Sequence, residues 1–241
     1  MPRNPQLTRG VKGEVTPYYD VAVLGETACG KSSIIERLVN GSFTQTYTPT
    51  AAEVHMTTLH EDNRRVACLQ LFDTAGGFQF PMMLRLTITK CQAFVVVYSV
   101  DSQRSLDVAI TQIQEIQNIK GKHFPCILVG SKCDLVAERE ITFDKGLQTA
   151  VSYGCAYIET SSLEDKNIKD VFLSLVKKIE FTASVKRQLF REQAAMRSGE
   201  EGKHGRKRSV RKFIVNLSNS FGDRDRLSSI DSDSSSDSDN E

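Results

Sequence analysis

The stretch Gly25-Glu26-Thr27-Ala28-Cys29-Gly30-Lys31-Ser32 is the most informative segment of the chain. It matches the pattern G-x-x-x-x-G-K-[ST], in which the glycines let the backbone wrap around phosphates and a following helix points its first N–H groups at them. The apolar run Val21–Leu24 precedes the stretch and a segment of helical period near 32–39 follows it, the context that the pattern requires. A chance match is expected in roughly 1 of 100 chains of this length. We therefore predict a phosphate-binding loop between a strand and a helix.

Each residue type in this loop has a chemical reason to be there. The Lys31 ammonium suits the β- and γ-phosphates, and the Ser32 hydroxyl suits Mg²⁺. Other predicted nucleotide-binding residues of the loop contribute mainly backbone: Gly25, Ala28, Cys29, Gly30 and Ser33.

On either side of the loop, short apolar runs alternate with longer segments of helical period, which is typical of βαβ units. Extended segments are expected near 21–24, 52–59, 65–72, 94–98, 126–129 and 156–158, and helical stripes include 105–120 and 168–179. This order predicts an α/β fold with a six-stranded, mostly parallel sheet flanked by about five helices. In such sheets ligands bind beyond the carboxyl ends of the strands, where the motifs fall.

A candidate metal site lies at the end of the predicted strand 65–72. Asp73 closes this apolar run and is suited to hold Mg²⁺ through water, and the N–H of Gly76 is suited to the γ-phosphate. Thr50 follows Pro49 in a polar segment, and its hydroxyl can ligate Mg²⁺ only while the γ-phosphate holds that segment in place. An ordinary Asp turn and a plain Thr/Pro loop are the alternatives, and the phosphate loop favours the metal site.

The segment Ser131-Lys132-Cys133-Asp134 is a candidate base reader. The Asp134 carboxylate can accept hydrogen bonds from N1–H and the exocyclic amine of guanine, an edge that adenine lacks. The Lys132 stem can cover the base, and Ser161 and Ser162 can supply a backbone N–H to the base carbonyl. These features favour GTP or GDP with Mg²⁺ and disfavour an ATP-using kinase of the same loop type.

With these motifs in view, residues 19–181 resemble the Ras superfamily and its P-loop G domain. The residues Asp73-Thr74-Ala75-Gly76, Gln79-Phe80-Pro81-Met82 and Glu159-Thr160-Ser161 are most similar to the Di-Ras branch of the Ras family, with Rap and Rhes close. The resemblance implies a GTPase, a hydrolase acting on GTP, that signals by binding effector proteins through its switch regions. It also places Phe43 among the nucleotide-binding residues. It identifies neither an exchange factor nor an activating protein.

Four positions depart from the Ras pattern. Gly77 stands where most Ras proteins carry the Gln that orients the attacking water, so the catalytic pair Gly76 and Gly77 predicts slow hydrolysis. Thr27 replaces a loop Gly and is expected to crowd an activating protein's Arg finger. Ser131 replaces an Asn and spans less, and Leu163 replaces a Lys, so both are expected to loosen the nucleotide. Compensated drift is the alternative, and a GTP-holding binding module with negligible hydrolysis is the alternative function.

The composition of the chain bears on its partners and its cellular compartment. Lys+Arg is 31 and Asp+Glu is 30, so the net charge of +1 gives no indication of nucleic acid as a partner. Six cysteines without a CxxC pair indicate free thiols in a reducing, cytoplasmic setting. A monomer is expected.

The two ends of the chain are expected to be flexible. Residues 1–18 are a predicted leader, and residues 182–241 are a predicted disordered tail because their charges are segregated into blocks. The tail holds a basic segment, 203–212, and an acidic, Ser-rich segment, 228–241. No prenylation motif closes the chain. The basic segment leaves open weak contact with the anionic plasma membrane, nuclear targeting, or a solvated linker.

Overall fold

The computed structural model describes residues 8–9, 15–44, 52–76 and 81–197. The chain divides into two units, Met1–Arg187 and Gln188–Glu241, and the central sheet with the helices packed on it belongs to the first. Thr50, Gly77 and the basic and acidic segments of the predicted tail lie outside the described residues.

The central sheet has six strands in the order β4-β5-β3-β6-β7-β8. Neighbouring strands are parallel except for the antiparallel pair β4 and β5. The bounds are Tyr18–Gly25 (β3), Ala52–Glu61 (β4), Arg64–Thr74 (β5), Ala93–Ser99 (β6), Cys126–Ser131 (β7) and Ala156–Glu159 (β8). The fully buried runs of β6 and β7 are what a strand covered on both faces requires. The predicted α/β fold class is confirmed.

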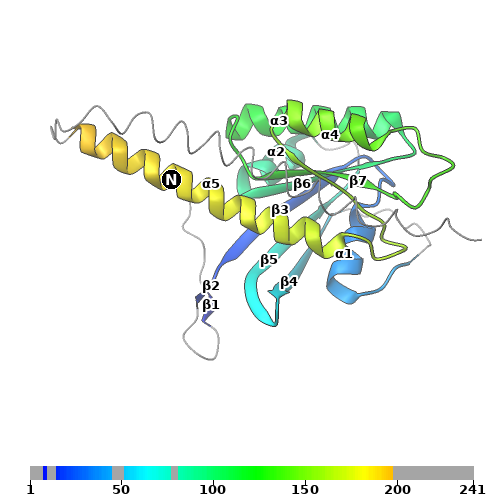
Figure 1. The fold of residues 1–241 in the computed structure, drawn as a ribbon, viewed down its shortest axis with the longest axis horizontal. Helices are drawn as coiled ribbons and strands as arrows, with labels where there is room; N and C mark the ends of the chain where they lie inside the picture. The colour runs from blue at the N-terminus through cyan, green and yellow to red at the C-terminus, as the bar shows by residue number, and fades with distance from the viewer. Residues whose placement is uncertain (1–7, 10–14, 45–51, 77–80, 198–241) are drawn as a thin grey trace, which may run out of the picture. The chain divides into compact units, whose positions relative to one another are not determined.

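Helices cover both faces of the sheet (Figure 1). Because successive strand residues point to opposite faces, Val21 and Val23 pack with α1 and α5, whereas Ala22 and Leu24 pack with α2 and α3. The helix bounds are Lys31–Asn40 (α1), Pro81–Lys90 (α2), Gln103–Lys120 (α3), Phe143–Ser152 (α4) and Ile168–Arg197 (α5). This two-sided packing holds the strands in place, and the site residues lie at the carboxyl ends of the parallel strands.

Both predicted flexible ends contain regular secondary structure in the parts that the structure describes. The expected leader 1–18 contains strands β1 (Thr8–Arg9) and β2 (Val15–Thr16), which pair antiparallel, and its last residue, Tyr18, already pairs with Cys68 on β5. The expected tail from residue 182 begins as helix, because α5 continues to Arg197. Charge segregation misled the prediction here: residues 182–197 contain neither Pro nor Gly to end a helix already docked on the sheet. No helix in the described ranges has the length and apolar character to cross a membrane.

Candidate functional site

The phosphate loop joins the end of β3 to the start of α1. Gly30 caps the helix with φ 94°, a left-handed conformation that strains other residues. A Cβ on Gly25 would lie 2.3 Å from the carbonyl oxygen of Val97, so no larger residue fits beside β6. The buried Lys31 places Nζ 2.7 Å from the carbonyl oxygen of Glu26, folding its ammonium back over the loop. The loop is therefore a tight turn at the start of α1, with the Lys31 ammonium folded over it.

Ser32 and Asp73, the two predicted metal ligands within the described residues, lie side by side. Ser32 Oγ donates to Asp73 Oδ2 at 2.6 Å, bringing together the start of α1 and the end of β5. Asp73 is 2% exposed, and its other oxygen, Oδ1, has no hydrogen-bond partner among the residues that the structure describes. Burial raises the pKa of this carboxyl, opposed by the Ser32 hydrogen bond and the Lys31 charge. A buried carboxylate oxygen without a partner is costly, and a divalent cation would satisfy it.

Gly76 lies directly against the phosphate loop. A Cβ at this position would fall 2.3 Å from Thr27 Cα and 2.4 Å from its backbone nitrogen. Glycine is therefore needed for close approach of the segment after β5 to the loop. The Thr27 side chain is exposed at this contact.

Ser131 connects the base-reading segment to the phosphate loop. Its hydroxyl is buried and lies 2.5 Å from the carbonyl oxygen of Cys29 and 2.9 Å from that of Tyr98. The short Ser131 side chain reaches the loop because β7 ends close to it, and the expected loosening of the nucleotide stays a prediction. The sequence could not show this distance.

The remaining base-reading residues come from two loops joined by backbone hydrogen bonds. Cys133 N donates to the carbonyl of Thr160 at 3.0 Å, so the Lys132–Asp134 turn and the turn after β8 are neighbours. Lys132 has a left-handed φ of 59°, and its Nζ lies 3.7 Å from Asp101 Oδ2. Asp134 is half-buried.

The turn after β8 holds the two predicted serines. Ser161 is fully buried and closes the turn through paired backbone hydrogen bonds with Lys166. Ser162 is half-buried and Ser33, on α1, is half-buried as well. Phe43 follows α1 and lies beside Arg37. The described site residues thus gather at one edge of the sheet.

An ion pair missed at the sequence level supports this edge. The Arg139 guanidinium makes two hydrogen bonds with the Glu159 carboxylate, at 2.7 and 2.9 Å. Tyr157 donates to the same carboxylate at 2.9 Å. The pair joins the segment after Asp134 to the end of β8, and no sequence spacing indicates it because 20 residues separate its members.

Comparisons with known proteins agree with this geometry. The model of the Ras family matches residues 20–181. The chain is 35% identical over 196 residues to the GTP-binding protein drn-1 of Caenorhabditis elegans, which covers 80% of this chain and 85% of drn-1. It is 38% identical over 160 residues to mouse Di-Ras2 and 39% identical over 160 residues to human Di-Ras1, each covering 66% of this chain and 80% of the relative. Because the family model covers residues 20–181 and these relatives are 35–39% identical, the chain belongs to the Ras family, in its Di-Ras branch.

Proposed function

We propose that this chain, a Ras-like small GTP-binding protein, is a signalling switch that binds GTP or GDP with Mg²⁺ and hydrolyses GTP slowly. Members of the Ras family are GTPases in general, and the relatives that match this chain are named GTP-binding proteins. The observation that carries the proposal is the pairing of Ser32 and Asp73 beside the phosphate loop, with one buried Asp73 oxygen left to bind a cation.

In this proposal, different residues bind the phosphates, the metal ion and the guanine base. The loop N–H groups and Lys31 hold the phosphates, and Ser32, Asp73 and Thr50 would hold Mg²⁺, which neutralises phosphate charge when bound. Asp134 selects guanine, and Ser161, Ser162, Lys132 and Phe43 enclose the base. Gly76 offers its N–H to the γ-phosphate. Effector proteins would recognise the segments around Thr50 and Gly76 in the GTP-bound state.

Slow hydrolysis follows from two positions. Gly77 has no side chain with which to orient water, so the barrier to attack is higher than with a Gln. Thr27 lies against Gly76, close enough that no Cβ fits there, and its exposed side chain occupies space that an Arg finger would enter. Slow turnover would leave the protein loaded with GTP for long periods. Leu163 stands in place of a Lys and is expected to speed nucleotide release, which would further favour the GTP-loaded state.

The first prediction tests the role of Gly77 by adding the missing side chain. Gly77→Gln is expected to raise single-turnover GTP hydrolysis at least about tenfold, which corresponds to ~1.4 kcal/mol of barrier. Gly77→Ala, which adds a methyl group but no amide, is the matched control and should leave the rate within about twofold. An unchanged rate in Gly77→Gln would refute the explanation for slow hydrolysis. Absence of turnover in the parent protein, even with candidate activators, would favour the binding module.

The setting of the switch is also a proposal. We place it in the cytoplasm as a monomer without a nucleic-acid partner. Its basic segment 203–212 would contribute about 1 kcal/mol per basic residue to contact with anionic lipid, and nuclear targeting is the competing role. Imaging the full chain with and without charge reversal of this segment distinguishes membrane, nuclear and diffuse distributions.

A further inference from the structure

Arg37 lies on α1 and belongs to none of the nucleotide-binding motifs, yet its head group donates to three backbone carbonyls in two segments. Nε donates to the carbonyl oxygen of Ser162 at 2.8 Å, and Nη2 donates to that of Leu163 at 3.1 Å. Nη1 donates to the carbonyl oxygen of Gly41 at 2.9 Å. The guanidinium therefore links the turn after β8, which holds the predicted base contact, to the end of α1.

The same guanidinium contacts Phe43. Arg37 Cζ lies 6.0 Å from the centre of the Phe43 ring, within the range of a cation–π interaction. Phe43 begins the segment that leads to Thr50, and the family resemblance places this ring at the nucleotide. One side chain thus touches both the ring and the backbone expected to enclose the base.

The backbone at Ser162 needs such support. Ser161, on one side, is fixed by its hydrogen bonds with Lys166 and by the Glu164 N–H, which donates to Ser161 Oγ at 3.1 Å. The Leu163 side chain on the other side is 55% exposed, so it contributes little packing. The two hydrogen bonds that Arg37 donates to the backbone carbonyls hold the turn at Ser162 and Leu163. An N–H aimed at a base carbonyl has to be held to within fractions of an ångström to be useful.

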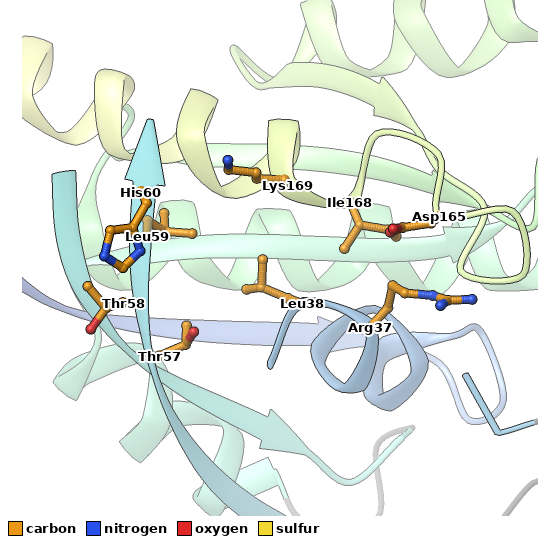
Figure 2. A pocket seen from close by; sticks show the side chains of 9 residues that line it. All are labelled: Arg37, Leu38, Thr57, Thr58, Leu59, His60, Asp165, Ile168 and Lys169. Atoms are coloured by element: carbon orange, nitrogen blue, oxygen red, sulfur yellow. The ribbon is translucent and has the colours of Figure 1, made fainter. Parts of the chain in front are cut away.

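Packing alone does not fix the position of Arg37. Its side chain lies at one end of a cavity of about 280 Å³ between α1, β4 and the start of α5, and its guanidinium points away from Leu38 and Thr57 (Figure 2). The carbonyl oxygens and the Phe43 ring are what direct the head group. A lysine could donate to one or two of these carbonyls but could not reproduce the planar fork.

We propose that Arg37 is a positioning residue of the guanine pocket: it holds the Ser162 backbone and the Phe43 ring against the base, which slows nucleotide release and sharpens the preference for guanine. This inference rests on the proposed binding of GTP and GDP. It adds a residue that acts through others and does not itself touch the nucleotide.

The test compares the full chain with Arg37→Lys and Arg37→Ala. Release of a fluorescent GDP in the presence of Mg²⁺ is expected to become about tenfold faster in Arg37→Ala, with Arg37→Lys restoring only part of the loss, since lost charge-assisted hydrogen bonds have effects of this order. Lys169→Ala, which removes another cation at the same cavity, is the matched control and is expected to release GDP at the parent rate.

A second readout separates positioning from general loosening of the fold. The preference for GDP over ADP should fall in both Arg37 variants, while the ratio of GDP to GMP affinity, which reports on the phosphate side, should stay unchanged. Parent-like release in both variants overturns the proposal, as does an equal fall in both ratios. If Arg37→Ala does not fold, Arg37→Lys decides by the same criteria. If the parent protein itself shows no preference for GDP over ADP, the proposed function fails, and the role of Arg37 with it.

Discussion

Single side chains at the nucleotide site carry contacts that their neighbours in sequence do not reveal. Ser131 is the clearest case, because one buried hydroxyl lies within hydrogen-bond distance of the carbonyl oxygens of Cys29 and Tyr98. A hydroxyl has a single proton to donate, so it serves one carbonyl at a time. Through this hydroxyl the end of β7 is linked to the loop between β3 and α1.

A second prediction follows for Ser131. Ser131→Ala leaves the buried Cys29 carbonyl without this donor, which costs about 1–3 kcal/mol. Because the loop is then less firmly held, GDP release should become faster, by about tenfold for ~1.4 kcal/mol. Stopped-flow release of a fluorescent GDP measures this. Ser152→Ala, whose hydroxyl bonds only locally to the Gln148 carbonyl among described residues, should not change the rate. Equal rates in Ser131→Ala and the parent would contradict the proposed link.

Two contacts of single residues differ in how far the sequence could predict them. Ser32 and Asp73 could be paired from the sequence, because their motifs assign both to one metal ion, and the structure places them 2.6 Å apart. The hydrogen bonds of Arg37 could not be predicted. A charged residue on a surface helix is ordinarily solvated, and two of the three Arg37 acceptors lie 125 and 126 residues away.

Among the elements, α4 packs on the sheet through a buried polar cluster. Gly146, at its centre, leaves room for the hydroxyl groups of Tyr98 and Tyr157, which share a hydrogen bond of 2.6 Å. A Cβ on Gly146 would lie 2.2 Å from the Tyr157 oxygen and 2.4 Å from that of Tyr98. The glycine thus lets α4 approach β6 and β8 closely, at the sheet edge that carries Ser131 and Glu159.

This contact yields a third prediction, in which helix propensity and packing have opposite signs. Alanine is favoured over glycine inside a helix by about 1 kcal/mol, so propensity alone predicts that Gly146→Ala stabilises the protein. Overpacking costs about 1–3 kcal/mol or more, and both tyrosines are held by hydrogen bonds and cannot move freely. Gly146→Ala should therefore lower the free energy of unfolding, measured by urea denaturation of the GDP-bound protein. If Gly146→Ala instead raised the free energy of unfolding, the two tyrosine side chains would have shifted at little cost.

For the molecule as a whole, buried ionisable groups lower the stability of the fold at high pH. Burial raises the pKa of the Cys91 thiol from 9.0 to about 12 and that of the Tyr98 phenol from 10.0 to about 12. Both groups therefore stay neutral in the folded protein over a pH range in which the same groups lose their protons in the unfolded chain. Their contribution to stability is complete below pH 9 and is lost as the pH rises toward the folded-state values.

A fourth prediction is that the free energy of unfolding falls progressively between about pH 9 and pH 12. Denaturant titrations at a series of pH values measure the slope. Cys91→Ala, which removes one of the two groups, should reduce the slope in that range relative to the parent. The parent and Cys91→Ala showing identical slopes would mean that the Cys91 thiol is not protected by burial.

Local sequence patterns were enough to predict the α/β fold, the turn between β3 and α1, and the proximity of Ser32 and Asp73. Each of these depends on adjacent residues or on a repeating pattern: a turn that needs glycine, a hydroxyl after a lysine, apolar runs that fill a sheet buried on both faces. The family match to residues 20–181 agrees with these predictions.

What supports the site became visible only in the folded chain. Strands β1 and β2 are two residues each, too short to produce a pattern, and α5 continues past residue 182 without an apolar signal to announce it. The bonds from Ser131 to Cys29, Arg37 to Ser162 and Arg139 to Glu159 join residues 102, 125 and 20 apart. Such contacts exist only because packing brings separate elements to one edge of the sheet, and no local pattern in the intervening residues shows that distance.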